Sequence, residues 1–244
     1  MARLVSLYWF RQDLRLADNP ALTAAAEAGA VLPVYILDDG HAGDHKMGGA
    51  SRWWLHNSLQ ALNDKLDGKL LVLKGDPVRL LPALAVASGA KKLYWNRCYE
   101  PWRIARDTAI KTELVKQGLN VESHNGSLLW EPWDVTKADG TPYRVFTPFF
   151  RRGCLGASPP RIPLPAPNQL DLVSLAYEQD GIDGLHLLPD IGWDTTLGAH
   201  WQIGEAGAKQ RLVTFIDQEL SGYKQGRNFP ARSHVSRLSP YLHW

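Results

Sequence analysis

The stretch "LVSLYWF" (residues 4–10), continued by "RQDLRLADNPALTAAAEAG" (11–29), decides the fold class. The first seven residues form an apolar, β-prone run, which predicts a strand buried on both faces. Asn19 can cap a helix, Pro20 suits the first helical position, and Gly29 can end the helix. A buried strand that leads directly into a capped helix is typical of parallel α/β folds.

The same pattern recurs three more times and is followed by a fifth strand. We predict further strands at 31–37, 70–75, 91–96 and 119–123, and helices at 52–68, 76–89 and 101–118. Pro33 has no N–H to donate, so we expect its strand to lie at an edge or to carry a bulge. Right-handed crossovers between these strands would give a doubly wound, five-stranded parallel sheet over residues 1–130.

The rest of the chain changes character twice. Residues 131–200 include the proline-rich "SPPRIPLPAPNQ" (158–169), which favours an extended interdomain connector. From residue 201 to 244 a helical period returns, with Leu212, Ile216 and Leu220 four apart. These residues are too few for a core of their own, so we expect the beginning of an all-helical domain that is truncated here.

Composition points to an ordinary soluble protein. The 244 residues are 45% hydrophobic and 21% charged, and the only cysteines are Cys98 and Cys154, far apart in the chain. We therefore expect no disulfide framework, no metal site and a cytoplasmic location. The first apolar run is too short to span a membrane. Residues 221–244 carry four basic residues and no acid, which suits either a phosphate-bearing partner or a solvated surface.

Several familiar signatures are missing. The first strand is not followed by G-x-G-x-x-G, and the chain contains no G-x-x-x-x-G-K-[ST], no nucleophile elbow and no H-E-x-x-H. The usual dinucleotide, nucleoside-triphosphate, hydrolase and metalloprotease sites are therefore not supported, although the fold class often carries such sites.

Charged residues follow two of the buried strands. Arg11, Asp13, Arg15 and Asp18 come after the first strand, where they could contact a ligand or form an ion-pair network that holds the loop.

The second polar group lies in "NRCYEPWRIARD" (96–107). There, Asn96, Glu100, Trp102 and Arg103 could line a pocket for a flat aromatic ligand, with polar groups at its edge and Trp on its face. Ordinary loop packing explains these four residues equally well.

The final stretch, "YKQGRNFPARSHVSRLSPYLHW" (223–244), holds the strongest candidate site. Ser236, Arg237 and Ser239 place two hydroxyls and a guanidinium within four residues, a set that suits a pyrophosphate. Tyr223 could add a phenol contact or a stacking face. Ser236 could also serve as a helix N-cap, which is compatible with anion binding.

These segments together resemble the photolyase/cryptochrome family. The resemblance covers essentially the whole chain and rests on "LYWFRQDLRLADNPAL" (7–22), "NRCYEPWRIARD", "YRVFTPFFRR" (143–152) and the final stretch. It implies an N-terminal α/β domain, a connector and a helical domain that binds FAD, so the chain looks like the N-terminal half of a DNA photolyase.

The resemblance also implies roles for particular residues. Those matching the family's FAD-binding positions are Tyr223, Val235, Ser236, Arg237, Leu238 and Ser239, and Arg227 matches a basic position near the DNA-binding face. Val235 stands where the family often has Thr, so one hydroxyl contact is lost. Family members often carry an antenna chromophore, a folate or a deazaflavin, for which Asn96, Glu100, Trp102 and Arg103 are candidates. Trp102 and Arg103 replace an Asn-Glu pair of the folate pattern, which puts that pose in doubt.

The implied activity is a carbon–carbon lyase reaction, in which light and reduced FAD repair cyclobutane pyrimidine dimers flipped out of damaged DNA. We expect a monomer, and we expect the 244-residue chain alone to be inactive. Two alternatives stay open. One is a cryptochrome-type blue-light photoreceptor that signals without repair, and the other is a stand-alone antenna-domain binding module.

Overall fold

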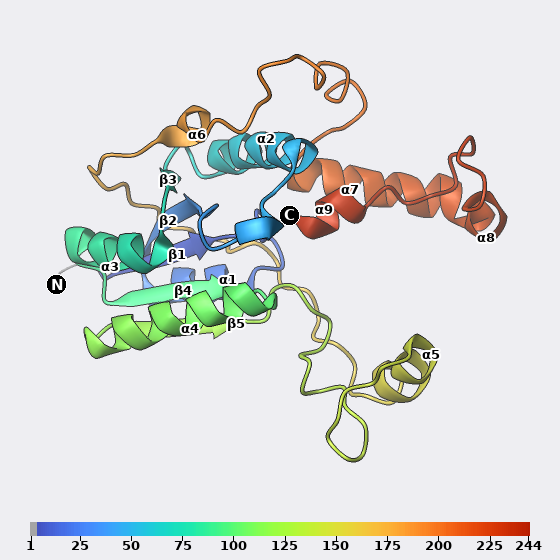
Figure 1. The fold of residues 1–244 in the computed structure, drawn as a ribbon, viewed down its shortest axis with the longest axis horizontal. Coiled ribbons are helices and arrows are strands. Elements are labelled where there is room, and N and C mark those ends of the chain that lie inside the picture. Colours follow the sequence, from blue (N-terminus) through green and yellow to red (C-terminus); the bar gives the residue numbers. More distant parts are fainter. Residues whose placement is uncertain (1–3) are drawn as a thin grey trace.

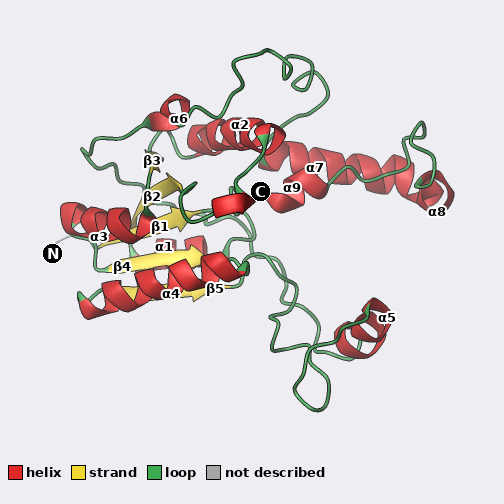
Figure 2. Ribbon diagram, viewed as in Figure 1, coloured by secondary structure: helices red, strands yellow, loops and turns green. Residues whose placement is uncertain are grey.

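Five parallel strands form the centre of the structure, a computed structural model that describes residues 4–244 (Figures 1 and 2). The strands are β1 (Val5–Phe10), β2 (Ala30–Leu37), β3 (Leu71–Lys74), β4 (Lys92–Asn96) and β5 (Asn120–His124). Their order is β3-β2-β1-β4-β5, which confirms the predicted doubly wound sheet. The winding reverses between β1 and β4, and in such sheets ligands bind at the carboxyl ends beside this reversal.

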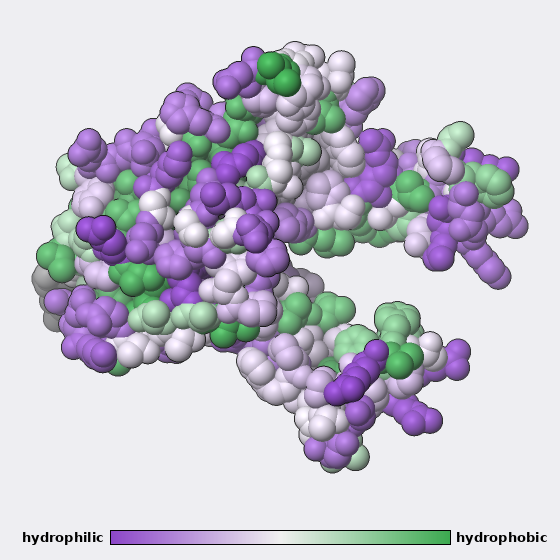
Figure 3. All heavy atoms as spheres, in the orientation of Figure 1, coloured by the Kyte–Doolittle hydropathy of each residue, from purple (hydrophilic) through white to green (hydrophobic). Residues whose placement is uncertain are grey.

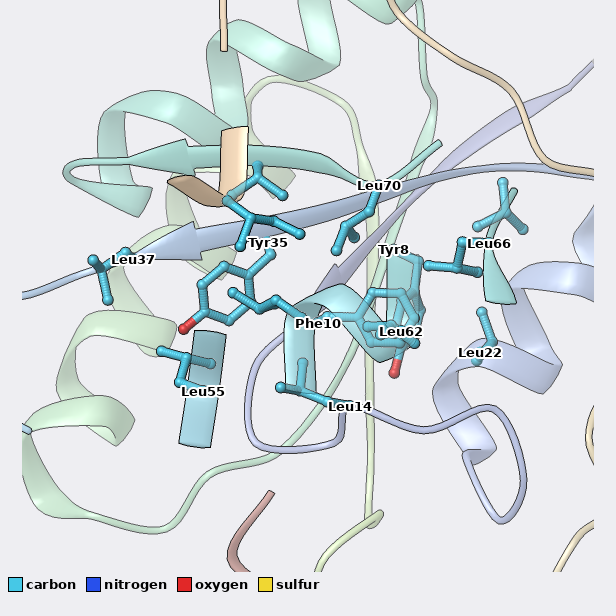
Figure 4. Packing of buried hydrophobic residues seen from close by; sticks show 14 of the residues in the cluster. Tyr8, Phe10, Leu14, Leu22, Tyr35, Leu37, Leu55, Leu62, Leu66 and Leu70 are labelled. Atoms are coloured by element: carbon cyan, nitrogen blue, oxygen red, sulfur yellow. The ribbon is translucent and has the colours of Figure 1, made fainter. Parts of the chain in front are cut away.

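Helices cover both faces of the sheet because side chains alternate along each strand. The four helices are α1 (Pro20–Ala28), α2 (Gly49–Lys65), α3 (Pro77–Ser88) and α4 (Pro101–Lys116). Tyr8 and Phe10 pack in one buried cluster with residues of α1 and α2, part of which Figure 4 shows. Leu7 and Trp9 point to the opposite face and pack with α3 and α4. The continuous apolar runs are therefore explained by burial on both sides.

Pro33 does not lie where the sequence suggested. The prediction of an edge strand was wrong, because β2 lies between β1 and β3. The pairing of β2 with β3 begins only at Val34, while Val31 bonds to the connector through the Asp171 carbonyl and the Val173 N–H. The N–H of Val31 faces this side of β2, and residues two apart direct their N–H groups to the same side. An N–H at position 33 would therefore point to the β3 side of β2. Because β3 begins to pair only at Val34, the absence of an N–H on Pro33 costs no hydrogen bond between strands.

The connector covers the edge of the sheet that β3 forms. The Val72 N–H donates to Gln179 Oε1 (3.2 Å), the Lys74 N–H donates to Asp180 Oδ2 (2.8 Å), and the Asp180 N–H donates to the Val72 carbonyl (3.2 Å). The short helix α6 (Gly181–Gly184) follows, and Ile182, Leu185 and Leu187 are buried in the α1–α2 side of the core. Backbone groups of β3 that would otherwise face solvent are thus satisfied.

Two projections extend from the α/β body (Figure 1). The first holds α5 (Phe146–Pro148) and a π-helical turn (Phe149–Cys154). The second begins with α7 (Glu205–Thr214), which runs through the turns Phe215–Glu219 and Leu220–Gly222 into α8 (Tyr223–Gly226); α9 (Ser239–His243) then returns to the body. The remaining element is a 3-10 turn, Gly43–His45.

Exposed apolar side chains mark both projections (Figure 3). Leu212, Ile216 and Leu220, which the sequence placed in one row, are 43%, 53% and 48% exposed. Phe146 and Phe150 stack on each other in the first projection and are also exposed. Within residues 4–244, no segment buries the side chains of Leu212, Ile216 and Leu220, whose spacing predicted a helical domain.

Candidate cofactor sites

A buried polar network holds the loop between β1 and α1. The Tyr8 hydroxyl donates to Asp13 Oδ2 (2.5 Å), and Asn96 Nδ2 donates to Asp13 Oδ2 (2.6 Å) and Asn19 Oδ1 (2.7 Å). Asn96 is 2% exposed, and an added Cβ on Gly126 would lie 2.4 Å from its Cγ. Asn96 therefore fixes the loop from inside, and it does not line the cavity described below.

Arg15 and Asp18 tie this loop to the connector. Arg15 Nη2 donates to the carbonyls of Asp18 (2.7 Å) and Gly126 (2.5 Å). Asp18 Oδ1 accepts from Arg161 and from the Leu164 N–H (3.1 Å), and these bonds hold the pKa of Asp18 below its usual range although partial burial opposes this. Asp18 thus forms an ion pair, with Arg161, whereas Arg15 holds the loop through backbone carbonyls alone.

A cavity of about 50 Å³, named here the Trp102 cavity, lies at the carboxyl ends of β1 and β2, beside the start of α4. It has aromatic and cationic walls, formed by Trp9, Tyr35, Trp102, Trp244, Arg11, Arg103 and Arg106, together with Gln12, Met47, Asp38 and the β2 residues Ile36 and Leu37. This volume is smaller than a site that encloses a whole ligand, so a chromophore would lie only partly inside it. Of the four residues predicted for an aromatic ligand, the structure brings Trp102 and Arg103 together in this wall.

Ion pairs fix the base of the Trp102 cavity. Arg106 Nη1 donates to Asp38 Oδ2 (2.9 Å), Arg106 Nη2 donates to Asp107 Oδ1 (2.9 Å), and Arg11 pairs with Asp107. Burial alone would raise the pKa of Asp38, but bonds from the His41 N–H and Arg106 lower it, so the carboxylate stays charged. With Arg103 and its outer partner Glu100, these groups comprise three cations and three anions, so the charges around the cavity are balanced within the protein.

Several buried donors in the Trp102 cavity lack a hydrogen-bond partner within the described residues. They are Arg11 Nε and Nη2, Trp9 Nε1 and Arg103 Nε. The Arg106 guanidinium lies over the rings of both Trp9 (4.9 Å) and Trp102 (5.1 Å), so it already covers part of both rings. Unpaired buried donors are costly, so a flat ligand with acceptor atoms at its edge would satisfy them.

The rim of the cavity joins it to the end of the chain. Gln12 Oε1 accepts from Arg103 Nη1 (2.8 Å), and Gln12 Nε2 lies 3.2 Å from His243 Nε2. Burial, with a further contribution from Arg103, lowers the pKa of His243. Glu100 is only an outer partner, because its carboxylate is 44% exposed and lies 3.6 Å from Arg103 Nε.

The residues proposed for phosphate binding lie on the second projection. The ring of His234 packs against Gly222 and Gly226, where an added Cβ would approach it to 2.8 Å and 2.4 Å, so α8 lies against the start of the 235–239 segment. Ser239 and Arg237 are exposed, and the Arg237 guanidinium lies 4.6 Å from the Trp201 ring centre. The hydroxyl and cation of these two residues are thus accessible to a ligand.

Tyr223, at the start of α8, and Arg227, directly after its end, form a separate surface pair. The Arg227 guanidinium lies 5.6 Å from the centre of the Tyr223 ring, and that ring makes an edge contact with Phe215 at 5.9 Å. Tyr223 is 37% exposed, so one side of it can contact a partner.

Comparison with known proteins decides the family. The DNA photolyase family profile matches residues 6–168. The chain is 42% identical to the deoxyribodipyrimidine photo-lyase of Agrobacterium fabrum over 97% of its length, and 34% identical to cryptochrome-2 of Arabidopsis thaliana over 98%. Its fold superposes on the class III photolyase of Agrobacterium tumefaciens with a TM-score of 0.92 and 40% identity, covering 99% of this chain and 50% of that one.

The chain belongs to the DNA photolyase family. It spans about half the length of the curated relatives it matches, 50% of the Agrobacterium photolyase and 40% of the Arabidopsis cryptochrome. A shorter relative exists in Synechococcus strain PCC 6716, a 31.6 kDa uncharacterized protein that is 32% identical and is covered over 85% of its length. The photolyase fold, with its parallel sheet followed by helices, is thus established for this chain.

Glu205 attaches the second projection to the photolyase α/β body. Its carboxylate accepts from the Leu16 N–H (3.1 Å) and pairs with Lys65 (3.1 Å) and Lys209 (2.8 Å). Partial burial would raise the pKa of Glu205, but the bonds from Lys209, Leu16 and Lys65 outweigh it and lower the pKa to about 2. The ionised form is therefore the one that holds α7 in place.

We expect Glu205→Gln to remove an acid-dependent part of the stability. Because the folded pKa lies below the ordinary glutamate value of 4.5, this contribution is complete above about pH 4.5 and is lost as the pH falls towards 2. With allowance for solvent screening, the variant should lose about 1 kcal/mol at pH 7 and almost nothing at pH 2. Urea unfolding of both proteins across this range measures the difference, and an equal loss at both pH values would contradict the assignment.

Sequence reasoning missed Arg106 and Asp38, although a signal for Arg106 exists. Arg106 lies four residues after Trp102 on α4, so both side chains share one helix face. Asp38 follows the second strand directly, at the same edge of the sheet as Arg11. Their pairing joins residues 68 apart in sequence, which no local pattern predicts.

The described residues contain neither a membrane-spanning helix nor a group of metal ligands. None of the helices in residues 4–244 is both long and apolar enough to cross a bilayer. Across the same residues, no three His, Cys, Asp or Glu side chains come together in a way that could hold a metal ion.

Proposed function

We propose that this chain forms the α/β domain, the connector and the start of the flavin domain of a deoxyribodipyrimidine photolyase, which repairs cyclobutane pyrimidine dimers in DNA with light and FAD. The observation that carries the proposal is the 42% identity with the Agrobacterium photolyase, against 34% and 35% with the two Arabidopsis cryptochromes. The structural similarity to the class III photolyase, at 40% identity, supports the same assignment.

The 235–239 segment would hold the diphosphate of FAD. The donors present fit this group, because Ser236 and Ser239 supply hydroxyls, Arg237 supplies a cation, and Val235 and Leu238 supply backbone groups. Tyr223, on α8, would contact the same cofactor. FAD itself supplies the light-driven electron transfer. The role of these residues is to bind and orient it.

The Trp102 cavity would hold an antenna chromophore, a folate or a deazaflavin. Trp9 and Trp102 offer aromatic faces, and the unpartnered nitrogens of Arg11 and Arg103 offer donors for ring or carboxylate oxygens. A folate would have to lie here in a different pose from the Asn-Glu pattern, because Trp102 and Arg103 occupy those positions.

Damaged DNA would approach the second projection. Lys224 lies on α8, Arg227 directly follows that helix, and Arg232 follows in the exposed loop before the 235–239 segment. Cations of this kind bind phosphates and make affinity depend on salt. A pyrimidine dimer pairs and stacks poorly, so flipping it out of the duplex costs less than flipping a normal base.

A cryptochrome-type photoreceptor that signals without repair is the second candidate. The 34–35% identity with the Arabidopsis cryptochromes over 98% of the chain favours it. Its flavin and antenna sites would use the same residues, so only the reaction separates the two candidates.

The decisive experiment uses the full product of the native gene, purified with its flavin reduced. Ultraviolet-irradiated oligonucleotides are illuminated with blue light, and the recovery of absorbance at 260 nm measures dimer splitting. We expect repair in light, none in the dark, and none by the 244-residue chain. Flavin photochemistry without repair would favour the cryptochrome, and a product that holds no flavin would contradict both.

A further inference from the structure

Arg211 of α7 reaches back to the backbone of the 235–239 segment. Its Nε donates to the Ser236 carbonyl (2.8 Å), and its Nη2 donates to the Val235 carbonyl (3.2 Å). The residues lie 24 and 25 positions apart in sequence, and the second projection folds back on itself to bring them together. One guanidinium thus binds two successive carbonyls of the segment.

This contact decides which way the N–H groups point. In a trans peptide the carbonyl and the following N–H point in opposite directions. Because Arg211 holds the carbonyls of Val235 and Ser236, the N–H groups of Ser236 and Arg237 face away from α7. These are donors that a bound anion needs.

The next residues extend the same arrangement. Arg237 has φ of 53°, in the left-handed region that non-glycine residues rarely adopt, whereas Leu238 is right-handed, with φ of −89° and ψ of −12°. Successive residues of opposite hand direct their N–H groups into one concavity that accepts anions. The Leu238 N–H also lies 3.5 Å from Ser236 Oγ, so that hydroxyl lines the same concavity.

Arg211 is itself held in position. Its Nη2 donates to Glu219 at the end of the π-helical turn, and the side chains of Arg211 and Glu219 are only 19% and 11% exposed. The planar guanidinium suits this task, because it can serve a carboxylate and two carbonyls at fixed angles. A lysine ammonium would keep the charge and lose this geometry.

We propose that Arg211 is a positioning residue that holds the backbone of the 235–239 segment in the conformation that binds a diphosphate. This inference rests on the proposed function of the segment. Arg211 acts through the two carbonyls, without contact to the anion, and Glu219 keeps it aligned. The residues that touch the anion are those of the segment itself.

The experiment measures binding of inorganic pyrophosphate to the 244-residue chain by calorimetry at several salt concentrations. The variants are Arg211→Gln, Arg211→Lys, Arg237→Gln, and the matched control Arg79→Gln on the exposed surface of α3. Amide hydrogen exchange of residues 236–239 is followed in each protein. Thermal unfolding checks that all of them remain folded.

We expect Arg211→Gln and Arg211→Lys each to weaken binding about tenfold and to accelerate exchange at residues 236–239, with Arg79→Gln unchanged. Because Arg211 does not touch the anion, the salt dependence of binding should stay as in the parent protein, whereas Arg237→Gln should reduce it. Full retention of affinity by Arg211→Lys, or a reduced salt dependence in Arg211→Gln, would overturn the positioning role. Absence of pyrophosphate binding by the parent chain would overturn the phosphate assignment of the segment as well.

Discussion

Replacing Arg106 by methionine is expected to destabilise the protein by about 3 kcal/mol. The Arg106 side chain is 4% exposed and lies between the carboxylates of Asp38 and Asp107 and the rings of Trp9 and Trp102. Removing it leaves two buried carboxylates with fewer partners, Asp38 with His41 and Asp107 with Arg11. Urea unfolding followed by far-ultraviolet circular dichroism measures the loss.

The pH dependence of the stability lost in Arg106→Met shows whether the buried carboxylates cause the loss. The loss should shrink below about pH 4, because Asp38 without Arg106 takes up a proton more readily. Arg79→Met, which removes an exposed arginine of α3, should change stability by less than about 0.5 kcal/mol. A loss below about 1 kcal/mol for Arg106→Met would mean that other groups already compensate both carboxylates.

If the Trp102 cavity binds the proposed antenna chromophore, Trp102→Ala is expected to lower the affinity for it roughly thirtyfold, since a stacked aromatic contact of this kind contributes about 1–3 kcal/mol. A reduced folate and a deazaflavin are titrated separately, and quenching of tryptophan fluorescence reports binding. The matched control is Trp133→Ala, which removes a tryptophan that is 63% exposed on the connector.

The two ligands give different information. A loss confined to one of them would identify the chromophore class that the Trp102 cavity accepts. Unchanged affinity in Trp102→Ala would place the chromophore elsewhere on the molecule. Failure of both ligands to bind the parent chain would contradict the cavity as an antenna site.

The architecture was largely predictable from local patterns. Continuous apolar runs such as residues 4–10 and caps such as Asn19 and Gly29 report burial and helix ends directly, and the predicted strands and helices match those observed within three residues. Pro33 was misplaced because its tolerance depends on where β3 begins to pair, which lies outside its own strand. Local sequence patterns do not show which residues of two neighbouring strands pair with each other.

The candidate sites were only partly predictable. Trp102 and Arg103 were found because they follow a strand at the edge where ligands bind, and they do line the cavity. Asn96 is the last residue of the same strand, yet it turns inward to the network of Asp13 and Asn19, and its neighbours come from residues 77 to 88 positions away. Arg211 gave no signal at all, since its role arises only when the second projection folds back.

The connector's cover on β3 bears on how the chain must fold. The bonds from Val72 to Gln179 and from Lys74 to Asp180 close loops of more than 100 residues, and such distant contacts slow folding. During synthesis β3 could pair with β2, but its outer edge would stay uncovered until about residue 187 had left the ribosome. A chain cut near residue 130 would keep all five strands and still present that bare edge to its neighbours, which favours aggregation. The cooperative folding unit is therefore longer than the segment that contains the sheet.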